Sequence, residues 1–195
     1  MSGDHRGPDD LPSTAWTVLG LLSFGRALSG YDVKKWADSS LGFFYWSPAP
    51  SQIYSELRRL ERHGYATSSA PPDADARNRR VYEITDAGRD ALGQWVRTAP
   101  EPTVLKHAAM LRIWLGHLTS PAELGVVVDG HRAELTAQLA AARHAAEGAR
   151  ADASWRYPAV VTRWVVRRIE AELSLLDDLE ADLADARPVE RARRA

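Results

Sequence analysis

Apolar and polar residues recur at helical spacing between Ser47 and Gly64. Counted at about 100° per residue, Ile53, Leu57 and Leu60 fall on one side of a helix. The opposite side is polar and basic, and carries Ser51, Ser55, Arg58 and Arg62, flanked by Gln52 and Arg59. Ser47 fits a helix N-cap and Gly64 fits a helix stop. The segment predicts an amphipathic helix whose polar face either meets solvent or enters a nucleic-acid groove.

The residues that follow this helix predict a hairpin. Residues 65–69 are a candidate strand, residues 70–78 hold two prolines and acidic turn formers, and residues 79–85 are a second candidate strand. Tyr82 and Ile84 alternate onto one face of the second strand. Helix, strand, loop and strand in this order are typical of the end of a winged helix.

Basic residues gather where the predicted loop returns to the second strand. Arg77, Arg79 and Arg80 lie there, at a position from which a hairpin tip reaches phosphates beside a groove. Next in the chain, Thr85 is placed to cap a further helix that runs to about Arg97.

The region before the amphipathic helix completes a helix-turn-helix pattern. Residues 12–24 are dense in apolar residues, as expected of a buried first helix, and residues 25–30 predict a turn. Residues 31–37 predict the short helix that precedes a recognition helix. Lys34 and Lys35 on that helix face either phosphate or solvent.

Five motifs together resemble the PadR family of transcriptional regulators, over nearly the whole chain. They are residues 15–22 (AWTVLGLL), 29–33 (SGYDV), 44–48 (FYWSP), 52–61 (QIYSELRRLE) with Gly64, and 80–88 (RVYEITDAG). The resemblance implies a winged-helix N-terminal domain, a helical C-terminal domain that dimerises, and a role mainly as a repressor relieved by small molecules. One departure is the wing loop, residues 70–76, which is more acidic than phosphate contact favours.

From about residue 102 the pattern predicts only helices. One spans residues 103–117, and a second restarts with Ser120 as cap and Pro121 in the first turn. Residues 122–150 are alanine-rich, with Leu135, Leu139, Ala142 and Ala146 on one seam. A last helix from about Pro158 places apolar residues at steps of three or four, namely Val161, Val165, Ile169, Leu173, Leu176, Leu179 and Leu183. This last seam fits an intramolecular bundle and a dimer interface equally well, and the resemblance favours the dimer.

These patterns predict a mainly α fold in two domains. Residues 11–98 are expected to form a winged helix-turn-helix DNA-binding domain with a two-stranded wing. Residues 99–187 are expected to form a helical dimerisation domain, and residues 1–10 and 188–195 flexible tails.

The overall charge argues against nucleic-acid binding, but its distribution does not. The 195 residues carry a net charge of −1, whereas DNA affinity depends on phosphate neutralisation. Acidic residues crowd the C-terminal segment, at Asp177, Asp178, Glu180, Asp182 and Asp185, away from the clustered arginines. The chain has no cysteine, no apolar run that suggests a membrane span and no signal-peptide pattern, so we expect a cytoplasmic protein.

Seven tryptophans are many for this length. The resemblance implies that aromatic side chains near the dimer interface contact flat aromatic effectors, and four candidates lie in or near the helical half: Trp95, Trp114, Trp155 and Trp164. Stacking on a planar ligand is the physical basis of such a site. Core packing is the commoner role of each tryptophan.

Neither a metal site nor an active site is expected. A helical bundle could bring His107, His117 and His131 together around a metal. They form no i, i+4 pair, however, and no carboxylate lies beside them in a known metal pattern, so structural roles are favoured. The sequence has no nucleophile elbow, phosphate loop or cysteine nucleophile. We therefore expect no enzyme and no cofactor.

The predicted function is regulation of transcription by a homodimer on a pseudo-palindromic operator in double-stranded DNA. The predicted DNA-binding residues are Lys34, Lys35, Ser51, Gln52, Tyr54, Ser55, Arg58, Arg59, Arg62, Arg77, Arg79 and Arg80. Ser51 and Gln52 are expected to contact base edges and the arginines to contact phosphates. The role of Tyr54 at a phosphate or base edge is implied by the resemblance. The alternative is a winged-helix adaptor that binds another protein.

Overall fold

The computed structural model describes residues 11–70, 80–149 and 155–185. The chain divides into two compact units, residues 1–101 and residues 102–195. The predicted tails and the centre of the predicted wing loop lie outside the described residues. No helix in the described ranges combines the length and apolar character needed to cross a membrane.

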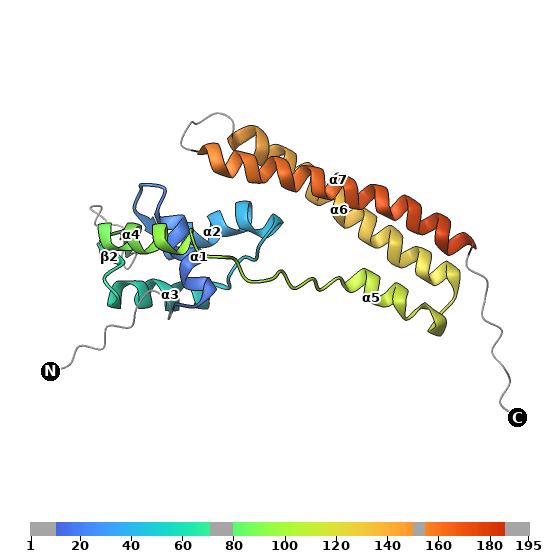
Figure 1. Ribbon diagram of the computed structural model, residues 1–195, viewed down its shortest axis with the longest axis horizontal. Coiled ribbons are helices and arrows are strands. Elements are labelled where there is room, and N and C mark those ends of the chain that lie inside the picture. Colours follow the sequence, from blue (N-terminus) through green and yellow to red (C-terminus); the bar gives the residue numbers. More distant parts are fainter. Residues whose placement is uncertain (1–10, 71–79, 150–154, 186–195) are drawn as a thin grey trace, which may run out of the picture. The chain divides into compact units, whose positions relative to one another are not determined.

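The described residues of the first unit form five helical segments and a small sheet, whose arrangement Figure 1 shows. In chain order its elements are α1 (Ser13–Leu22), β1 (Leu28–Ser29), α2 (Gly30–Ser40), the 3-10 helix η2 (Leu41–Phe43), α3 (Pro50–Arg62), β2 (Ala66–Ser69), β3 (Val81–Ile84) and α4 (Asp86–Trp95). The mainly α fold with a two-stranded wing is thereby confirmed, with β2 and β3 as the wing strands.

A third strand joins the wing where the sequence predicts only a turn. The antiparallel sheet has the order β1-β3-β2, with Leu28 opposite Tyr82 and Ser29 opposite Val81. A strand of two residues has no periodicity to read, so only its pairing with a distant partner defines it.

The core of the first unit forms around the apolar stripe of α3. Ile53, Leu57 and Leu60 have no exposed surface, and they pack with Leu19 and Val33 from α1 and α2. Burying each of these side chains stabilises the fold by roughly 1.5–3 kcal/mol. The predicted stripe is confirmed, and its burial fixes which side of α3 faces outward.

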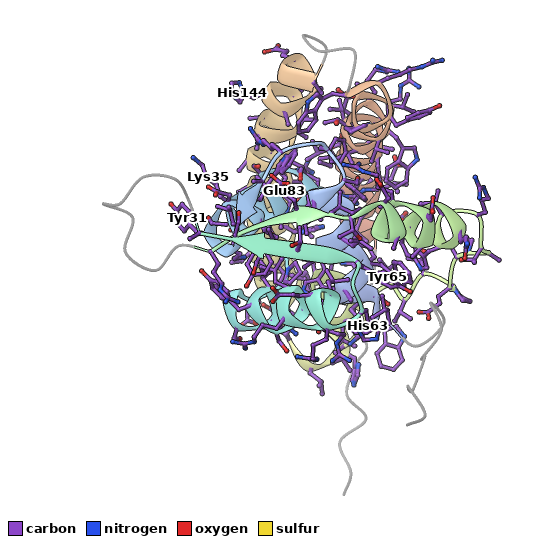
Figure 2. All side chains as sticks on the ribbon, turned by 90° about the vertical axis from the view of Figure 1, so that its left-hand side faces the viewer. Tyr31, Lys35, His63, Tyr65, Glu83 and His144 are labelled. Atoms are coloured by element: carbon purple, nitrogen blue, oxygen red, sulfur yellow. The ribbon has the colours of Figure 1, made fainter. Side chains whose placement is uncertain are left out.

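A tight turn connects α3 to the sheet and to the start of α4. Gly64 has a φ of +72°, which favours glycine. Thr85 caps α4 as predicted, since its Oγ1 accepts from the Gly88 N–H at 3.1 Å and donates to the Gly64 carbonyl at 2.6 Å. The Thr85 N–H also donates to the Tyr65 carbonyl at 3.0 Å. Figure 2 shows His63 and Tyr65 at this turn, where α3 ends and β2 begins.

The elements that the described residues of the second unit form are all helices. They are α5 (Ala108–Trp114), the 3-10 helix η3 (Gly116–Leu118), α6 (Pro121–Ala149) and α7 (Arg156–Asp185). Ser120 caps α6 as predicted: its Oγ accepts from the Glu123 N–H at 3.3 Å, and a Glu123 oxygen accepts from the Ser120 N–H at 2.9 Å.

The predicted helix over residues 103–117 is wrong in its first turns. Residues 101–107 are not helical, and α5 begins only after His107, which caps it. Val104 and Leu105 are 78% and 81% exposed. An isolated apolar stripe that packs on nothing does not sustain a helix in water, because helical stability comes mostly from tertiary packing.

The long helices α6 and α7 pack against each other (Figure 1). Leu135, Leu139 and Ala142 of α6 are buried, as are Val165 and Ile169 of α7. The α7 seam that the resemblance assigns to dimerisation is therefore covered largely by α6 of the same chain. The intramolecular packing named as the alternative is thus present for much of this seam, and a role of the seam in a dimer stays a prediction.

Replacing Gly88 by Ala is expected to destabilise the first unit. A Cβ at this position would lie 2.1 Å from the Tyr65 carbonyl oxygen, so backbone must shift, at a cost of roughly 1–3 kcal/mol. Gly93→Ala on the same helix is the control, since a Cβ there meets nothing within 4 Å. Urea denaturation is expected to show Gly93→Ala equal to or more stable than the parent. Equal destabilisation by both variants would contradict this account.

Acidification is expected to weaken the start of α6. Hydrogen bonds from the Thr119 hydroxyl, the Ser120 N–H and the Ser120 hydroxyl lower the pKa of Glu123 from 4.5 to about 2. Because the folded-state pKa is depressed, the stabilisation is present above the unfolded pKa and is lost as pH falls through the folded one. NMR titration is expected to place the pKa of Glu123 near 2, and Thr119→Ala to raise it. A pKa of 4.5 in both proteins would overturn this prediction.

Candidate nucleic-acid interface

The exposed face of α3 carries six of the predicted contact residues. They are Ser51, Gln52, Tyr54, Ser55, Arg58 and Arg62, all exposed. Ile53, Leu57 and Leu60 on the opposite face are fully buried. The structure thus presents one polar, basic helix face in a fixed orientation. We call these six residues the α3 face.

Gln52 lies at the N-terminus of α3 and helps to close it. Its Oε1 accepts a hydrogen bond from the Ala49 N–H at 2.9 Å. The predicted N-cap, Ser47, is wrong, because α3 begins at Pro50 with Ala49 as its cap residue. The Gln52 side chain is therefore held at the helix end that approaches base edges in recognition helices.

Tyr54 lies against the start of α2. A Cβ built on Gly30 would come within 2.9 Å of three atoms of the Tyr54 ring. The tyrosine remains 45% exposed. Gly30 therefore leaves the space that the Tyr54 ring occupies at the junction of α2 and α3, with part of the ring in solvent.

Lys34 links α2 to the segment that enters α3. Its Nζ donates to Asp38 at 2.5 Å and to the Ser47 hydroxyl at 3.1 Å, and Ser47 in turn donates to Asp38 at 2.5 Å. The hydrogen bonds from Lys34 and then Ser47 lower the pKa of Asp38. The charge of Lys34 is thus partly compensated, whereas Lys35 is exposed.

The arginines of this region fall into two groups. Arg59 pairs with the buried Glu56 at 2.8 Å, and Arg80 lies 3.8 Å from Glu61. Arg58 and Arg62 are exposed and form no ion pair with another described residue. The uncompensated positive charge of α3 therefore comes from these two. Arg77 and Arg79 lie outside the described residues.

The four tryptophans named as effector candidates are divided between the two units. Trp95 belongs to the first unit and stacks on Trp16, with ring centroids 5.5 Å apart. Trp114 on α5 and Trp164 on α7 are exposed, and Trp155 is half-buried just before α7. The cavity between α5, α6 and α7 is lined by none of them.

Sequence reasoning missed two groups of interacting residues. The i, i+4 spacing of Lys34 and Asp38 signals their ion pair, but the Ser47 contact depends on tertiary structure. His107, His131 and Glu172 converge in the second unit. The sequence names the two histidines as residues that a helical bundle could bring together, but it gives no signal for Glu172.

Three helices, with the exposed α3 as the third, followed by an antiparallel hairpin define a winged helix-turn-helix protein. Residues 18–94 match the Transcriptional regulator PadR-like family. The matched residues all lie within the first unit.

Proteins similar in sequence include a regulator named PadR. The "Negative transcriptional regulator PadR" of Bacillus subtilis is 36% identical over 100 residues, which cover 51% of this chain and 54% of that protein. The chain thus spans about half of that relative's length in this alignment.

Solved structures resemble most of the chain. One is Bacillus subtilis PadR in complex with operator DNA, at 26% identity and a TM-score of 0.73, covering 88% of this chain and 99% of that one. Another is the same protein in complex with p-coumaric acid, at 28% identity and a TM-score of 0.67, covering 87% and 98%.

Proposed function

We propose that this protein is a cytoplasmic, homodimeric transcriptional repressor that binds a pseudo-palindromic operator and is released from it by a small aromatic effector. The observation that carries the proposal is the exposed α3 face, held outward by the buried stripe of the same helix in a PadR-like domain. The similar structure of Bacillus subtilis PadR with operator DNA supports it.

Different residues of α3 contact the base edges and the phosphates of the operator. Ser51, Gln52 and Ser55 lie on the N-terminal part of the exposed face and contact base edges, because recognition helices enter the major groove N-terminus first. Tyr54 contacts a phosphate or a base edge. Arg58 and Arg62, nearer the C-terminus, contact phosphates.

The remaining predicted residues act at the edges of this interface. Lys35 and Arg80 supply further charge beside the groove, with Arg77 and Arg79 from the wing. Lys34 and Arg59 are paired with Asp38 and Glu56, so each brings only part of its charge to a DNA phosphate. Their main contribution is therefore to the geometry of the interface.

A dimer doubles the phosphate contacts and places two copies of α3 about one helical turn, ~34 Å, apart. Because the α7 seam packs on α6, dimerisation uses a different face of the second unit. Tyr157, Val160, Trp164 and Leu175 are exposed and recur at helical spacing along α7. This exposed stripe is the surface that we assign to the partner copy.

The similar structure of Bacillus subtilis PadR with p-coumaric acid supports an effector of the hydroxycinnamate kind. Trp114, Trp155 and Trp164 of the second unit remain the candidates for stacking on it, and Trp164 lies on the proposed dimer stripe. We propose no catalytic activity and no cofactor requirement for repression.

Footprinting the full-length protein across its own genome tests the proposal. It is expected to yield a pseudo-palindromic site, which the protein then binds more tightly than a single half-site. Protection without any shared sequence, or equal affinity for the half-site, would contradict the proposal. The adaptor alternative predicts no protected DNA at all.

Arg58→Ala is expected to weaken binding to the operator and to random DNA alike, and to reduce the salt slope by about one counterion. Gln52→Ala is expected to weaken binding to the operator by ~1–3 kcal/mol with a smaller effect on random DNA. Fluorescence anisotropy at several salt concentrations measures both.

Arg143→Ala is the matched control for charge, because this exposed arginine pairs with Glu170 in the second unit. It is expected to leave both affinities unchanged. Gln52 also caps the N-terminus of α3. If Gln52→Ala lowers the affinity for random DNA as much as for the operator, the loss comes from the missing cap and not from a missing base contact. An unchanged affinity in Arg58→Ala would remove that residue from the interface.

A further inference from the structure

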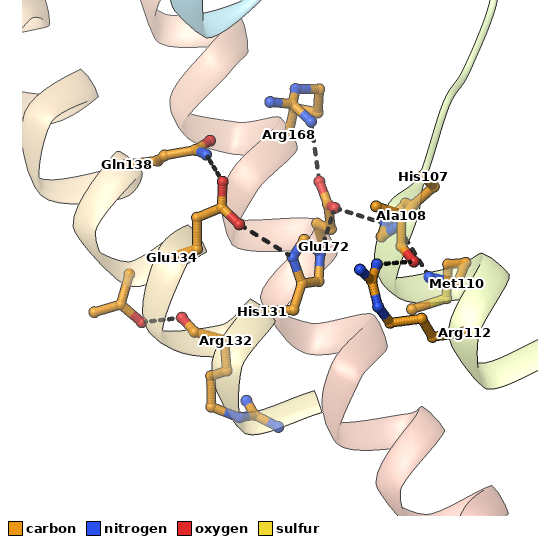
Figure 3. Close-up of polar contacts among 11 residues, drawn as sticks. His107, Ala108, Met110, Arg112, His131, Arg132, Glu134, Gln138, Arg168 and Glu172 are labelled. Atoms are coloured by element: carbon orange, nitrogen blue, oxygen red, sulfur yellow. Dashed lines mark hydrogen bonds and ion pairs between the residues drawn. The ribbon is translucent and has the colours of Figure 1, made fainter. Parts of the chain in front are cut away.

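Three side chains from separate elements of the second unit meet at one point (Figure 3). His107 caps α5, His131 lies on α6 and Glu172 on α7. The His107 Nε2 lies 3.2 Å from Glu172 Oε1, and the His131 Nε2 lies 3.1 Å from the same oxygen. We refer to these residues as the His-His-Glu cluster.

We propose that the His-His-Glu cluster binds one divalent transition-metal ion of the Zn²⁺ class. Tetrahedral zinc with nitrogen and oxygen ligands at about 2.0–2.2 Å places neighbouring ligand atoms about 3.3 Å apart. The two histidine-to-carboxylate distances match that edge. All three ligand atoms lie within 4.8 Å of one another, so small side-chain rotations bring them around one ion.

The chemistry of the donors selects the class of ion. Two imidazoles and one carboxylate suit zinc and its neighbours, whereas magnesium and calcium prefer oxygen ligands only. The side chains are 21%, 15% and 22% exposed, so water competes with them only partly.

Further charged residues lie just outside the three ligands. Glu134 Oε2 lies 4.0 Å from His131 Nδ1, and Glu134 itself accepts from Gln138 at 3.1 Å. Arg168 donates to the second oxygen of Glu172 at 2.9 Å. Carboxylates behind a histidine ligand, and hydrogen bonds to a carboxylate ligand, orient such groups and raise metal affinity.

One contact opposes metal binding and sets a cost. The His107 Nδ1 accepts from the Met110 N–H at 3.3 Å, so its Nε2 carries the proton when the ring is neutral. Metal binding at Nε2 moves that proton to Nδ1 and gives up this long cap bond. Coordination of the ion replaces it.

Three protein ligands leave a fourth position for a water molecule or a small anion. The cluster lines a cavity of about 520 Å³ between α5, α6 and α7, which also includes Arg112. Because α5 buries no residue, an ion that joins His107 to α6 and α7 fixes a helix that little else holds. The proposed ion therefore has a structural role, independent of DNA binding.

The test uses the untagged full-length protein after chelator treatment, titrated with Zn²⁺ against a chromophoric chelator and with Co²⁺ as a spectroscopic probe. We expect one tight ion per chain, intense Co²⁺ absorption of a tetrahedral site, and shifted ring resonances of His107 and His131 in NMR spectra with Zn²⁺. These readouts need no variant. Octahedral Co²⁺ spectra with unshifted ring resonances would overturn the proposal.

Substitutions then assign the ligands. His131→Ala and Glu172→Gln are expected to weaken Zn²⁺ binding by more than about 100-fold, and Glu134→Gln, behind His131, by about 10–100-fold. His144→Ala on the exposed side of α6 and His117→Ala in η3 are the matched controls and are expected to bind as the parent does. Equal loss in the controls, or none in His131→Ala, would show that the ion binds elsewhere.

Discussion

The packing of the apolar stripe of α3 on α1 is the contact on which the rest of the first unit depends. Ile53, Leu57 and Leu60 have no exposed surface. Since a helix has a fixed rotation per residue, burying this stripe also sets the direction of every polar side chain on α3. Arg58 and Arg62 face solvent for that reason, not because of contacts of their own. A substitution that weakens this core would thus disorder the α3 face, although it changes none of the residues on that face.

The sequence was enough to predict those features of the fold that depend on residues close together in the chain. The stripe of α3, the two wing strands, and the caps at Thr85 and Ser120 were all readable, because each depends on residues within one or two turns. The start of α5 was not, since exposed Val104 and Leu105 mimic a packed stripe. Whether the seam of α7 packs within or between chains also depends on tertiary contacts that no periodicity encodes.

The candidate sites show the same division. The residues of the α3 face could be predicted from their spacing alone. Only the structure shows that Arg59 differs from the exposed Arg58 and Arg62, because Arg59 pairs with Glu56. Glu172 lies 65 residues from His107 and 41 from His131 in sequence, so no motif joins them. A chain of net charge −1 can still present a basic face on α3 because many of its acidic residues lie on α7, in the second unit. On α7, Asp177 and Glu180 pair with Arg132, at 2.7 and 3.0 Å.

Side-chain oxidation by hydroxyl radicals, with and without DNA, tests the central claim that the α3 face contacts the operator. Tyr54, 45% exposed on that face, and Trp114, 78% exposed in the second unit, are the two reporters. The account predicts that saturating operator DNA protects Tyr54 from oxidation and leaves Trp114 as reactive as before. An unprotected Tyr54 in the bound complex, with protection of Trp114 instead, would contradict it.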